Sequence, residues 1–342
     1  MHNSPFYGKI PHSELRDTVF KFLGVHSKKV ILGPKIGEDA AIINIGSRAL
    51  IISTDPITGA IKNVGWLSVH INANDVASCG VKPSWYLCSI LLPKSSSKKM
   101  IRKIMSEIDM ACKELMISVI GGHSEVAPNL DRPIVIGTMI GETHKKNYVT
   151  SSDAKPGNRI ILTKSVGLEG AAILATDFYE VLSQRIDSHV LKRAGKFMQS
   201  ISIVKDALTA MKVGGVNAMH DLTEGGLLSG LWEIAEASGV GLRVYDANIP
   251  IAEETRELCN ELGIDCLGLM SSGALLICSK AENTNEILST LREKKISASV
   301  IGEITPAKEG RYIMRVGGVK DKIRPPAQDE LYKAIGGLLH EK

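Results

Sequence analysis

Four short segments in the first half of the chain combine carboxylates, amides and glycines in a way that suits metal and phosphate chemistry. They read GPKIGEDAA (33–41), STDPITG (53–59), HINANDVASCGVKP (70–83) and IGGHSEVAP (120–128). Three of them contribute one aspartate each, namely Asp39, Asp55 and Asp75. Carboxylates from separate segments suit a hard cation such as Mg²⁺, which takes oxygen ligands and completes its shell with water and substrate phosphates. Asp39 alone could be a turn residue and Asp55 a strand-end cap, but their joint occurrence favours a metal site.

The segment 70–83 is unusual because polar residues interrupt an apolar helical pattern. Asn72, Asn74 and Asp75 alternate there with aliphatic residues. An amide or carboxylate that is buried without a partner costs about 1–3 kcal/mol. Two interpretations remain open: these side chains face solvent, or they are buried and hold a metal ion together with phosphates.

The second half of the chain contains one comparable cluster, MHDLTEGGLLSGL (219–231). Asp221 and Glu224 flank Thr223, which is well placed to cap a helix over residues 223–239. Acidic residues near a helix N-terminus are commonly explained by the helix dipole alone. The alternative is that the backbone amides of this helix start form an anion or substrate site together with the upstream segment SVGLEG.

Patterns typical of strands and helices alternate along the chain, which predicts a mixed α/β (α+β) fold. Apolar, β-branched runs predict strands over residues 48–56, 132–142, 159–165, 273–279, 296–304 and 311–316. Apolar residues at helical spacing predict helices over residues 98–116 and 223–239, and a third that begins within 167–178. The polar stretch SSDAKPGN is the best boundary, so we expect two domains, residues 1–152 and 153–342.

The composition narrows the class of protein. A net charge of +4 from 41 basic and 37 acidic residues, with only 4% aromatics, indicates neither a basic surface nor a stacking platform for nucleic acid. No apolar run approaches the roughly 18 residues of a membrane span, and the first residues lack the apolar centre of a signal peptide. We therefore expect a cytoplasmic protein with no membrane partner. The six cysteines form no C-x-x-C pair and are expected to be structural thiols.

Taken in order, these segments resemble the superfamily of aminoimidazole ribonucleotide (AIR) synthase, selenophosphate synthetase, thiamine-monophosphate kinase and the hydrogenase-maturation protein HypE. IGEDAAII resembles that family's G-D-D-A-A segment, with Glu38 in place of the first aspartate, and STDPI resembles its T-T-D strand end. NANDVASCGVKP is similar to its N-D-x-A-x-x-G-x-x-P helix, and GGHSEV stands in the place of G-G-[DE]-T. KPGNRIILTKSVGLEGAAILA, MHDLTEGGL and SSGALL resemble its second-domain motifs. The match covers nearly the whole chain, and the HypE branch is the most similar.

The resemblance implies a two-domain AIR-synthase-like fold and a homodimer whose N-terminal sheets close a shared barrel. It also implies ATP and Mg²⁺ as cofactors, and transfer of the γ-phosphoryl group to an amide or carbonyl oxygen of an acceptor. The residues that match metal-binding motifs are Asp39, Asp55, Asp75 and Glu125. Those that match nucleotide-binding motifs are Gly37, Thr54, Asn72, Asn74, Gly121, Gly122, His123 and Ser124. The catalytic residues that would face the acceptor are Asp221 and Glu224.

Three departures from the family pattern bear on the reaction. HypE proteins end in a Pro-Arg-x-Cys-type tail whose cysteine carries the reacting group, whereas this sequence ends AIGGLLHEK and its last cysteine is Cys278. We therefore do not expect dehydration on the chain's own tail. His123 stands where the family usually has Asp or Glu, so we expect Glu125 to replace it as a ligand or one metal ion to be lost. The N-terminal Cys or Sec of selenophosphate synthetase, with its following Lys, is missing, which argues against that activity.

Three functions remain open. The favoured one is an ATP- and Mg²⁺-dependent enzyme that acts on a small-molecule or protein-borne acceptor, with a possible maturation partner protein. The second is a kinase of the thiamine-monophosphate type, whose second-domain motif usually reads D-x-S-D-G-L, against DLTEGGL here. The third is a nucleotide-binding maturation or regulatory partner without catalysis. The GEDAA, STD and ND segments argue against this third function, because a protein without catalysis has no physical need for buried acids.

Overall fold

The computed structural model describes residues 8–60, 62–315 and 317–340, and the chain divides into two compact units. Unit 1 consists of the residues up to 26, residues 34–38 and the residues from 149 onward. Unit 2 consists of residues 27–33 and 39–148. The N-terminal segment thus belongs to the same unit as the C-terminal half, a grouping that the expected division into residues 1–152 and 153–342 does not contain.

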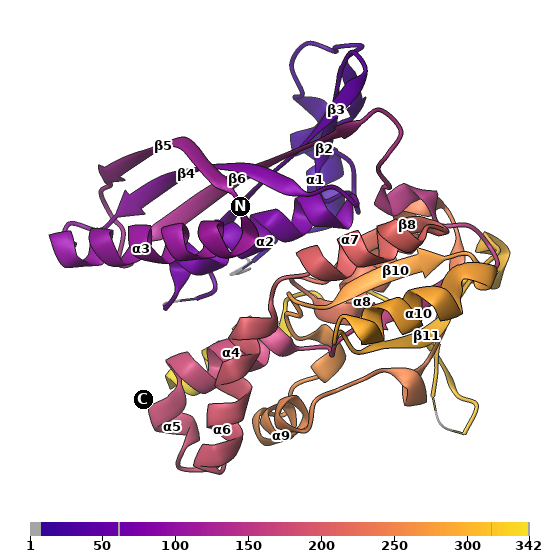
Figure 1. Ribbon diagram of the computed structural model, residues 1–342. Coiled ribbons are helices and arrows are strands. Elements are labelled where there is room, and N and C mark those ends of the chain that lie inside the picture. The colour runs from indigo at the N-terminus through magenta and orange to yellow at the C-terminus, as the bar shows by residue number, and fades with distance from the viewer. Residues whose placement is uncertain (1–7, 61, 316, 341–342) are drawn as a thin grey trace. The chain divides into compact units, whose positions relative to one another are not determined.

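Unit 2 is built on a six-stranded sheet with two helices on one face (Figure 1). The strand order is β1 (Val30–Leu32), β2 (Ala41–Ile45), β3 (Arg48–Ile57), β6 (Ile134–His144), β4 (Pro83–Leu92) and β5 (Ser118–Val126). Neighbouring strands are antiparallel except β4 and β5, which are parallel and connected through α3 (Lys98–Leu115). The other helix, α2 (Val64–Ser78), packs against α3, β3 and β6. The strands expected over 48–56 and 132–142 and the helix expected over 98–116 are confirmed.

One edge of this sheet, β5, is exposed along its whole length. Every residue from Ser118 to Val126 is exposed, including the apolar side chains of Val119, Ile120 and Val126. The glycine pair Gly121–Gly122 lies inside this strand, because β5 pairs with β4 on both sides of it. A long, apolar edge strand is a ready template for pairing with another chain.

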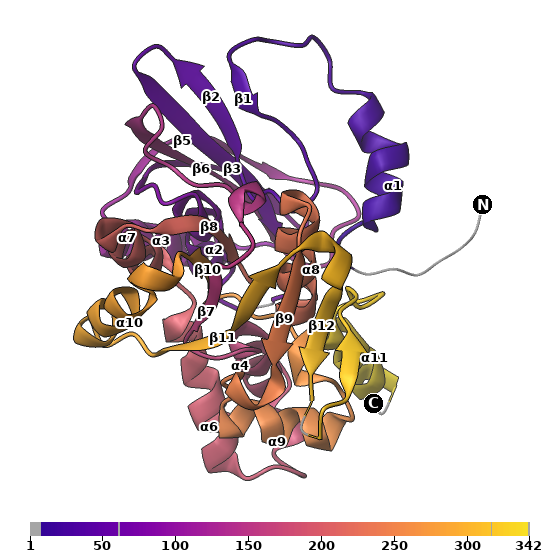
Figure 2. The ribbon, with the colours of Figure 1, turned by 90° about the vertical axis from the view of Figure 1, so that its right-hand side faces the viewer.

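Unit 1 is built on a seven-stranded, mostly antiparallel sheet (Figure 2). Its order is β13 (Lys320–Lys322), β12 (Arg311–Met314), β9 (Gly241–Tyr245), β11 (Ala298–Thr305), β7 (Arg159–Thr163), β10 (Leu275–Ser279) and β8 (Val216–Asp221). Among the described strands of this sheet, β12 and β9 are parallel neighbours and the other neighbours are antiparallel. The strands expected over 159–165, 273–279, 296–304 and 311–316 are therefore confirmed.

The core of unit 1 lies on both faces of this sheet, because successive side chains of a strand point to opposite sides. On one face, α8 (Gly226–Ser238) packs on β7 and β10 through Ile160, Leu162, Leu276, Cys278, Leu227, Leu231 and Ile234. On the other, α7 (Val204–Val213) and α10 (Thr284–Glu293) contact each other and the strands β10 and β11. Cys278 is fully buried, as expected for a structural thiol.

The remaining helices of unit 1 surround this core. They are α1 (His12–Asp17), α4 (Leu168–Asp177), α5 (Tyr179–Leu182), α6 (Ser188–Gly195), α9 (Glu253–Leu262) and α11 (Glu330–His340). Short 3₁₀ helices lie at Val19–Lys21, Ser151–Asp153, Lys196–Ser200, Asp246–Asn248, Cys266–Gly268, Ala281–Asn283 and Ala307–Glu309. Among the described residues, no helix combines the length and the apolar character needed to cross a membrane.

The start of α8 differs from the expectation that Thr223 would cap it. The helix begins at Gly226, and its N-cap is Gly225. Gly225 and Gly226 have φ values of +77° and +56°, so the chain makes a left-handed turn between Thr223 and the first helical turn. The hydroxyl of Thr223 instead accepts a hydrogen bond from Lys9 Nζ at 3.0 Å.

Candidate functional site

The polar residues of α2 do not face solvent. Asn72 and Asn74 are 0% exposed and Asp75 is 4% exposed, so the solvent interpretation of this segment is wrong. Asn72 is held on β3 by two hydrogen bonds, one from the Asp55 amide to its Oδ1 at 2.8 Å and one from its Nδ2 to the Asp55 carbonyl at 3.2 Å. The Asn72 side chain therefore ties the middle of α2 to the backbone of Asp55, which lies two residues before the end of β3.

Asp75 and Asp39 are connected through hydroxyl groups. The Ser53 hydroxyl of β3 donates to Asp75 Oδ2. The Ser78 hydroxyl lies 2.7 Å from the Asp75 carbonyl and 3.0 Å from Asp39 Oδ2. Hydroxyl donors orient a carboxylate without neutralising its charge, so these bonds leave the aspartates suited to bind a cation.

The close approach of α2 to the sheet depends on a glycine of β6. A Cβ at Gly137 would collide with Asn72 Nδ2 and would lie 2.8 Å from Ser68 Oγ. The carbonyl of Gly137 also accepts from Thr54 Oγ1 at 2.7 Å. The predicted site residues thus lie along α2, in the second half of β3 and in the turn just before β2; they are Asp39, Thr54, Asp55, Asn72, Asn74 and Asp75.

The predicted residues of β5 lie apart from this group. In the strand order, β6 and β4 separate β5 from β3, which at the usual strand spacing amounts to roughly 14 Å. Gly122 is needed for packing, because its φ is +153° and a Cβ there would collide with the Cys88 carbonyl oxygen. His123 Nε2 lies 3.3 Å from Glu125 Oε2, and both side chains are exposed. Within one chain, β5 is therefore a separate exposed surface.

In unit 1, the predicted residues gather near the N-terminus of α8. Asp221 is the buried last residue of β8. Glu224 accepts hydrogen bonds from the Lys9 amide at 2.7 Å and from the Tyr332 hydroxyl at 3.2 Å. Gly37 packs on α8, where a Cβ would lie 2.6 Å from the Glu233 carbonyl oxygen.

A cavity of about 330 Å³ lies beside this turn. It is lined by residues of the N-terminal segment (9–12), of the α8 start (224, 225, 229, 233) and of the segment 325–329. Glu224 lines it, whereas Asp221 does not. Of the two predicted catalytic residues, only Glu224 is therefore in contact with this cavity.

Asp329 links the α8 turn to its surroundings. Its carboxylate accepts from the Gly225 amide at 2.5 Å, from the Leu331 amide at 2.7 Å and from the Met270 amide at 3.3 Å. Burial, with Glu224 nearby, raises the pKa of Asp329 to about 7, against the lowering effect of these amides. Burial also raises the pKa of the fully buried Glu169 to about 7, although a hydrogen bond from Ser272 opposes the shift.

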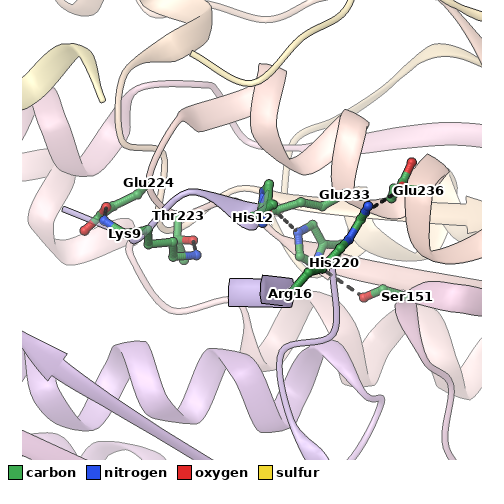
Figure 3. Close-up of polar contacts among 9 residues, drawn as sticks. All are labelled: Lys9, His12, Arg16, Ser151, His220, Thr223, Glu224, Glu233 and Glu236. Carbon is green, nitrogen blue, oxygen red and sulfur yellow. Dashed lines mark hydrogen bonds and ion pairs between the residues drawn. The ribbon is translucent and has the colours of Figure 1, made fainter. Parts of the chain in front are cut away.

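A buried chain of side chains runs behind the same helix start (Figure 3). Ser151 Oγ lies 3.3 Å from His220 Nδ1, and His220 Nε2 lies 2.9 Å from Glu233 Oε2. The other oxygen of Glu233 lies 3.3 Å from His12 Nε2. Burial alone would raise the pKa of Glu233, but the hydrogen bonds from His12 and His220 hold it well below its usual range. Glu233 is thus an ionised carboxylate between two imidazoles.

The residues around the start of α8 that form these contacts were mostly not predicted from the sequence. His220 stands inside the segment MHDLTEGGL, so its neighbourhood to Asp221 was a usable signal. His12 and Glu233 carry no local pattern, because they meet across a long sequence separation. Asp329 directly precedes α11 and accepts from the Leu331 amide, which is a local signal for a helix cap, but its contact with Gly225 has no such signal.

Comparison with protein families identifies relatives of both halves. The family of AIR synthase related proteins matches residues 37–143 with its N-terminal domain and residues 155–315 with its C-terminal domain. A protein of Methanocaldococcus jannaschii, provisionally named as a hydrogenase expression/formation protein, is 27% identical over 91% of this chain and 92% of its own length. The carbamoyl dehydratase HypE of Azotobacter vinelandii is 28% identical over 73% of this chain and 72% of its own.

Solved structures share the fold. HypE in a HypE–HypF complex superposes with a TM-score of 0.75 and 21% identity, over 91% of this chain and 99% of that chain. HypE in complex with ATP superposes with a TM-score of 0.72 and 21% identity, over 95% and 97%. The thiamine monophosphate kinase of Aquifex aeolicus gives a TM-score of 0.69 and 18% identity, over 92% and 100%.

Proposed function

This chain belongs to the AIR synthase related proteins, and on that premise we propose that it is an ATP- and Mg²⁺-dependent enzyme that transfers the γ-phosphoryl group of ATP to an amide or carbonyl oxygen of an acceptor. The observation that carries the proposal is the buried arrangement of unit 2, in which α2 brings Asn72 and Asp75 against β3. Burying a carboxylate costs free energy unless a partner compensates for the lost water, and a bound cation would be such a partner for Asp75.

Asp39, Asp55 and Asp75 would hold the metal ion, since each offers the hard carboxylate oxygen that Mg²⁺ prefers and Ser78 connects Asp39 with Asp75. When bound, Mg²⁺ would neutralise charge on the phosphates during transfer. Two hydroxyl groups position the carboxylate oxygens of the site: Ser53 orients Asp75 and Ser78 orients Asp39. Such positioning is the main contribution a protein makes to phosphoryl transfer.

In unit 2, the nucleotide would contact Thr54, Asn72 and Asn74, together with the four β5 residues Gly121, Gly122, His123 and Ser124. Because β5 lies roughly 14 Å from β3 within one chain, we assign its contribution to a homodimer in which the two unit 2 sheets close a shared barrel. Glu125 of β5 would then supply an additional metal ligand.

The homodimer has its own test. Ile120→Lys places a charge in the middle of the exposed face of β5, where a buried interface would reject it. Light scattering after size-exclusion chromatography is expected to give twice the chain mass for the wild type and the single chain mass for the variant. Lys113→Gln, on the exposed part of α3, is the control and should leave the dimer intact. A wild type that is monomeric at micromolar concentration would contradict the shared barrel.

The acceptor would be a separate small molecule or a group carried by a partner protein. The cysteines of this chain do not offer a free group for it: five are buried and Cys266 is half-buried. Because a relative is named as a hydrogenase expression/formation protein and HypE has been solved with HypF, we include a maturation partner protein in the proposal. Glu224, which lines the cavity of unit 1, and Asp221 would act on the acceptor side.

The decisive experiment is calorimetric titration of ATP with and without Mg²⁺, followed by phosphate release from the same sample. Saturable binding that needs Mg²⁺ supports a metal–nucleotide site. Binding without phosphate release across a panel of amide, carbamoyl and alcohol acceptors would favour a regulatory nucleotide-binding protein. No binding under either condition would reject the proposal and leave the buried acids with a structural role only.

A further inference from the structure

The N-terminal strap, residues 9–17, lies across α8 without burying any side chain of its helix. The strap contains α1, whose six residues include no buried one. It is attached to unit 1 by polar contacts at three places, all drawn in Figure 3. A helix of this length is marginal by itself, so its order depends on what it docks against.

Two of the three attachments pair a basic side chain of the strap with an acidic side chain of α8. The third is made by Lys9 through its backbone amide and its ammonium group. Lys9 donates from its amide to Glu224 at 2.7 Å and from Nζ to Thr223 at 3.0 Å. His12 Nε2 lies 3.3 Å from Glu233. Arg16 donates to Glu236 at 2.8 Å.

The spacing of these contacts fits two helices that lie alongside each other. His12 and Arg16 are four residues apart on α1, and Glu233 and Glu236 are three residues apart on α8, so each pair occupies one helical face. The His12 ring also stacks on Trp232, with the ring centroids 5.0 Å apart and the planes 14° apart. Charge and ring stacking together define one docked position.

The Arg16–Glu236 contact is weak enough to be reversible. Arg16 and Glu236 are 53% and 32% exposed, and ion pairs with such exposure are screened by salt and contribute little individually. His12 Nδ1 is buried without a hydrogen-bond partner, so the docked state carries an unsatisfied polar atom. Leu15, the apolar residue of α1, is only half-buried and offsets this cost in part.

Strap residues form one wall of the cavity beside the α8 turn. Lys9, Ile10, Pro11 and His12 line it, together with the segment 325–329. We propose that the strap is a displaceable lid that controls access to this cavity, held by charged contacts to Glu233 and Glu236 and by the hydrogen bonds of Lys9. The inference concerns unit 1 alone and does not depend on whether the chain binds ATP.

Hydrogen–deuterium exchange of the full chain tests the lid directly. The amides of α1 are compared in the wild type, in Arg16→Gln and in Lys21→Gln, at about 0.01 and about 1 M NaCl, over which the screening length falls from about 30 to about 3 Å. Lys21 is an exposed basic residue of the segment that follows α1, which makes it the matched control. Exchange of α1 is expected to rise several-fold in Arg16→Gln and in high salt, while the amides of α8 and the Lys21→Gln protein behave as the wild type.

A second measurement reports whether His12, a residue of the cavity wall, stays stacked on Trp232. In a Trp66→Phe/Trp85→Phe protein, Trp232 is the remaining tryptophan, and acrylamide quenching of its fluorescence should increase with salt and with Arg16→Gln as the His12 ring leaves it. Two results would overturn the proposal. If neither exchange nor quenching changes with salt or with Arg16→Gln, the strap is fixed. If the α1 amides of the wild type exchange completely at low salt, the strap does not dock.

Discussion

Replacing Asp75 with asparagine is expected to reduce Mg²⁺-dependent phosphate release from ATP by on the order of 10²–10³-fold, the range found when one electrostatic contact to a transition state is removed. The side chain keeps its shape, and its remaining oxygen can still accept from the Ser53 hydroxyl. The fold of unit 2 should therefore survive, while a charge that the cation needs is lost. Phosphate release and the calorimetric affinity for ATP in Mg²⁺ should fall together.

The matched control for this variant is Asp109→Asn on α3, in the same unit. Asp109 is exposed and pairs with Lys113 at 2.7 Å one helical turn away, so its loss removes the same charge from a solvated position. It should leave both binding and phosphate release unchanged. An Asp75→Asn protein that is folded and releases phosphate at the wild-type rate would remove Asp75 from the metal site.

The α2 segment illustrates what the sequence can predict. Its apolar spacing identifies a helix, and the polar residues within it are conspicuous because buried amides and carboxylates need partners. Whether they are buried could not be decided from the segment itself. The answer depends on Gly137 of β6, more than 60 positions away, which lets α2 approach close enough for Asn72 to reach the backbone of Asp55. The local sequence pattern thus predicts that this segment is a helix, whereas the partners of its polar side chains depend on contacts with distant parts of the chain.

The α8 region illustrates which contacts could not be predicted from the sequence. The segment MHDLTEGGL correctly predicts the start of a helix, but the expectation that Thr223 caps it is wrong, because Gly225 and Gly226 take left-handed backbone conformations and the helix begins at Gly226. The carboxylate at that start comes from Asp329, more than 100 positions later, and accepts from the Gly225 amide. A partner supplied by a distant loop leaves no periodic or local signal in the sequence.

Two buried glutamates of unit 1 show that hydrogen-bond partners determine whether a buried carboxylate stays ionised. Glu169 and Glu233 are both buried, yet burial raises the pKa of Glu169 to about 7, whereas hydrogen bonds from His12 and His220 overcome burial and hold the pKa of Glu233 well below its usual range. The hydroxyl of Ser272 does not offset the loss of water around Glu169, but two imidazoles do so around Glu233. Glu233 is therefore the carboxylate whose charge unit 1 depends on.

Glu233→Gln should accordingly lower the free energy of unfolding of unit 1 by about 3 kcal/mol at pH 7, because removing one partner of a buried pair leaves the other without compensation. Glu236→Gln, one turn along the same helix, is the control and should cost under about 1 kcal/mol, since its pairs with Arg16 and Arg311 are partly solvated.

The pH dependence of this stability follows from the direction in which folding shifts the pKa of Glu233. A lowered folded-state pKa gives stability that is fully present above the ordinary glutamate pKa of about 4.3 and is lost as the pH falls through the folded value. Urea unfolding at pH 7 should thus separate the two variants, and the gap between wild type and Glu233→Gln should narrow below about pH 4. Equal destabilisation by both variants at pH 7 would mean that the carboxylate between His12 and His220 contributes no more than a surface ion pair.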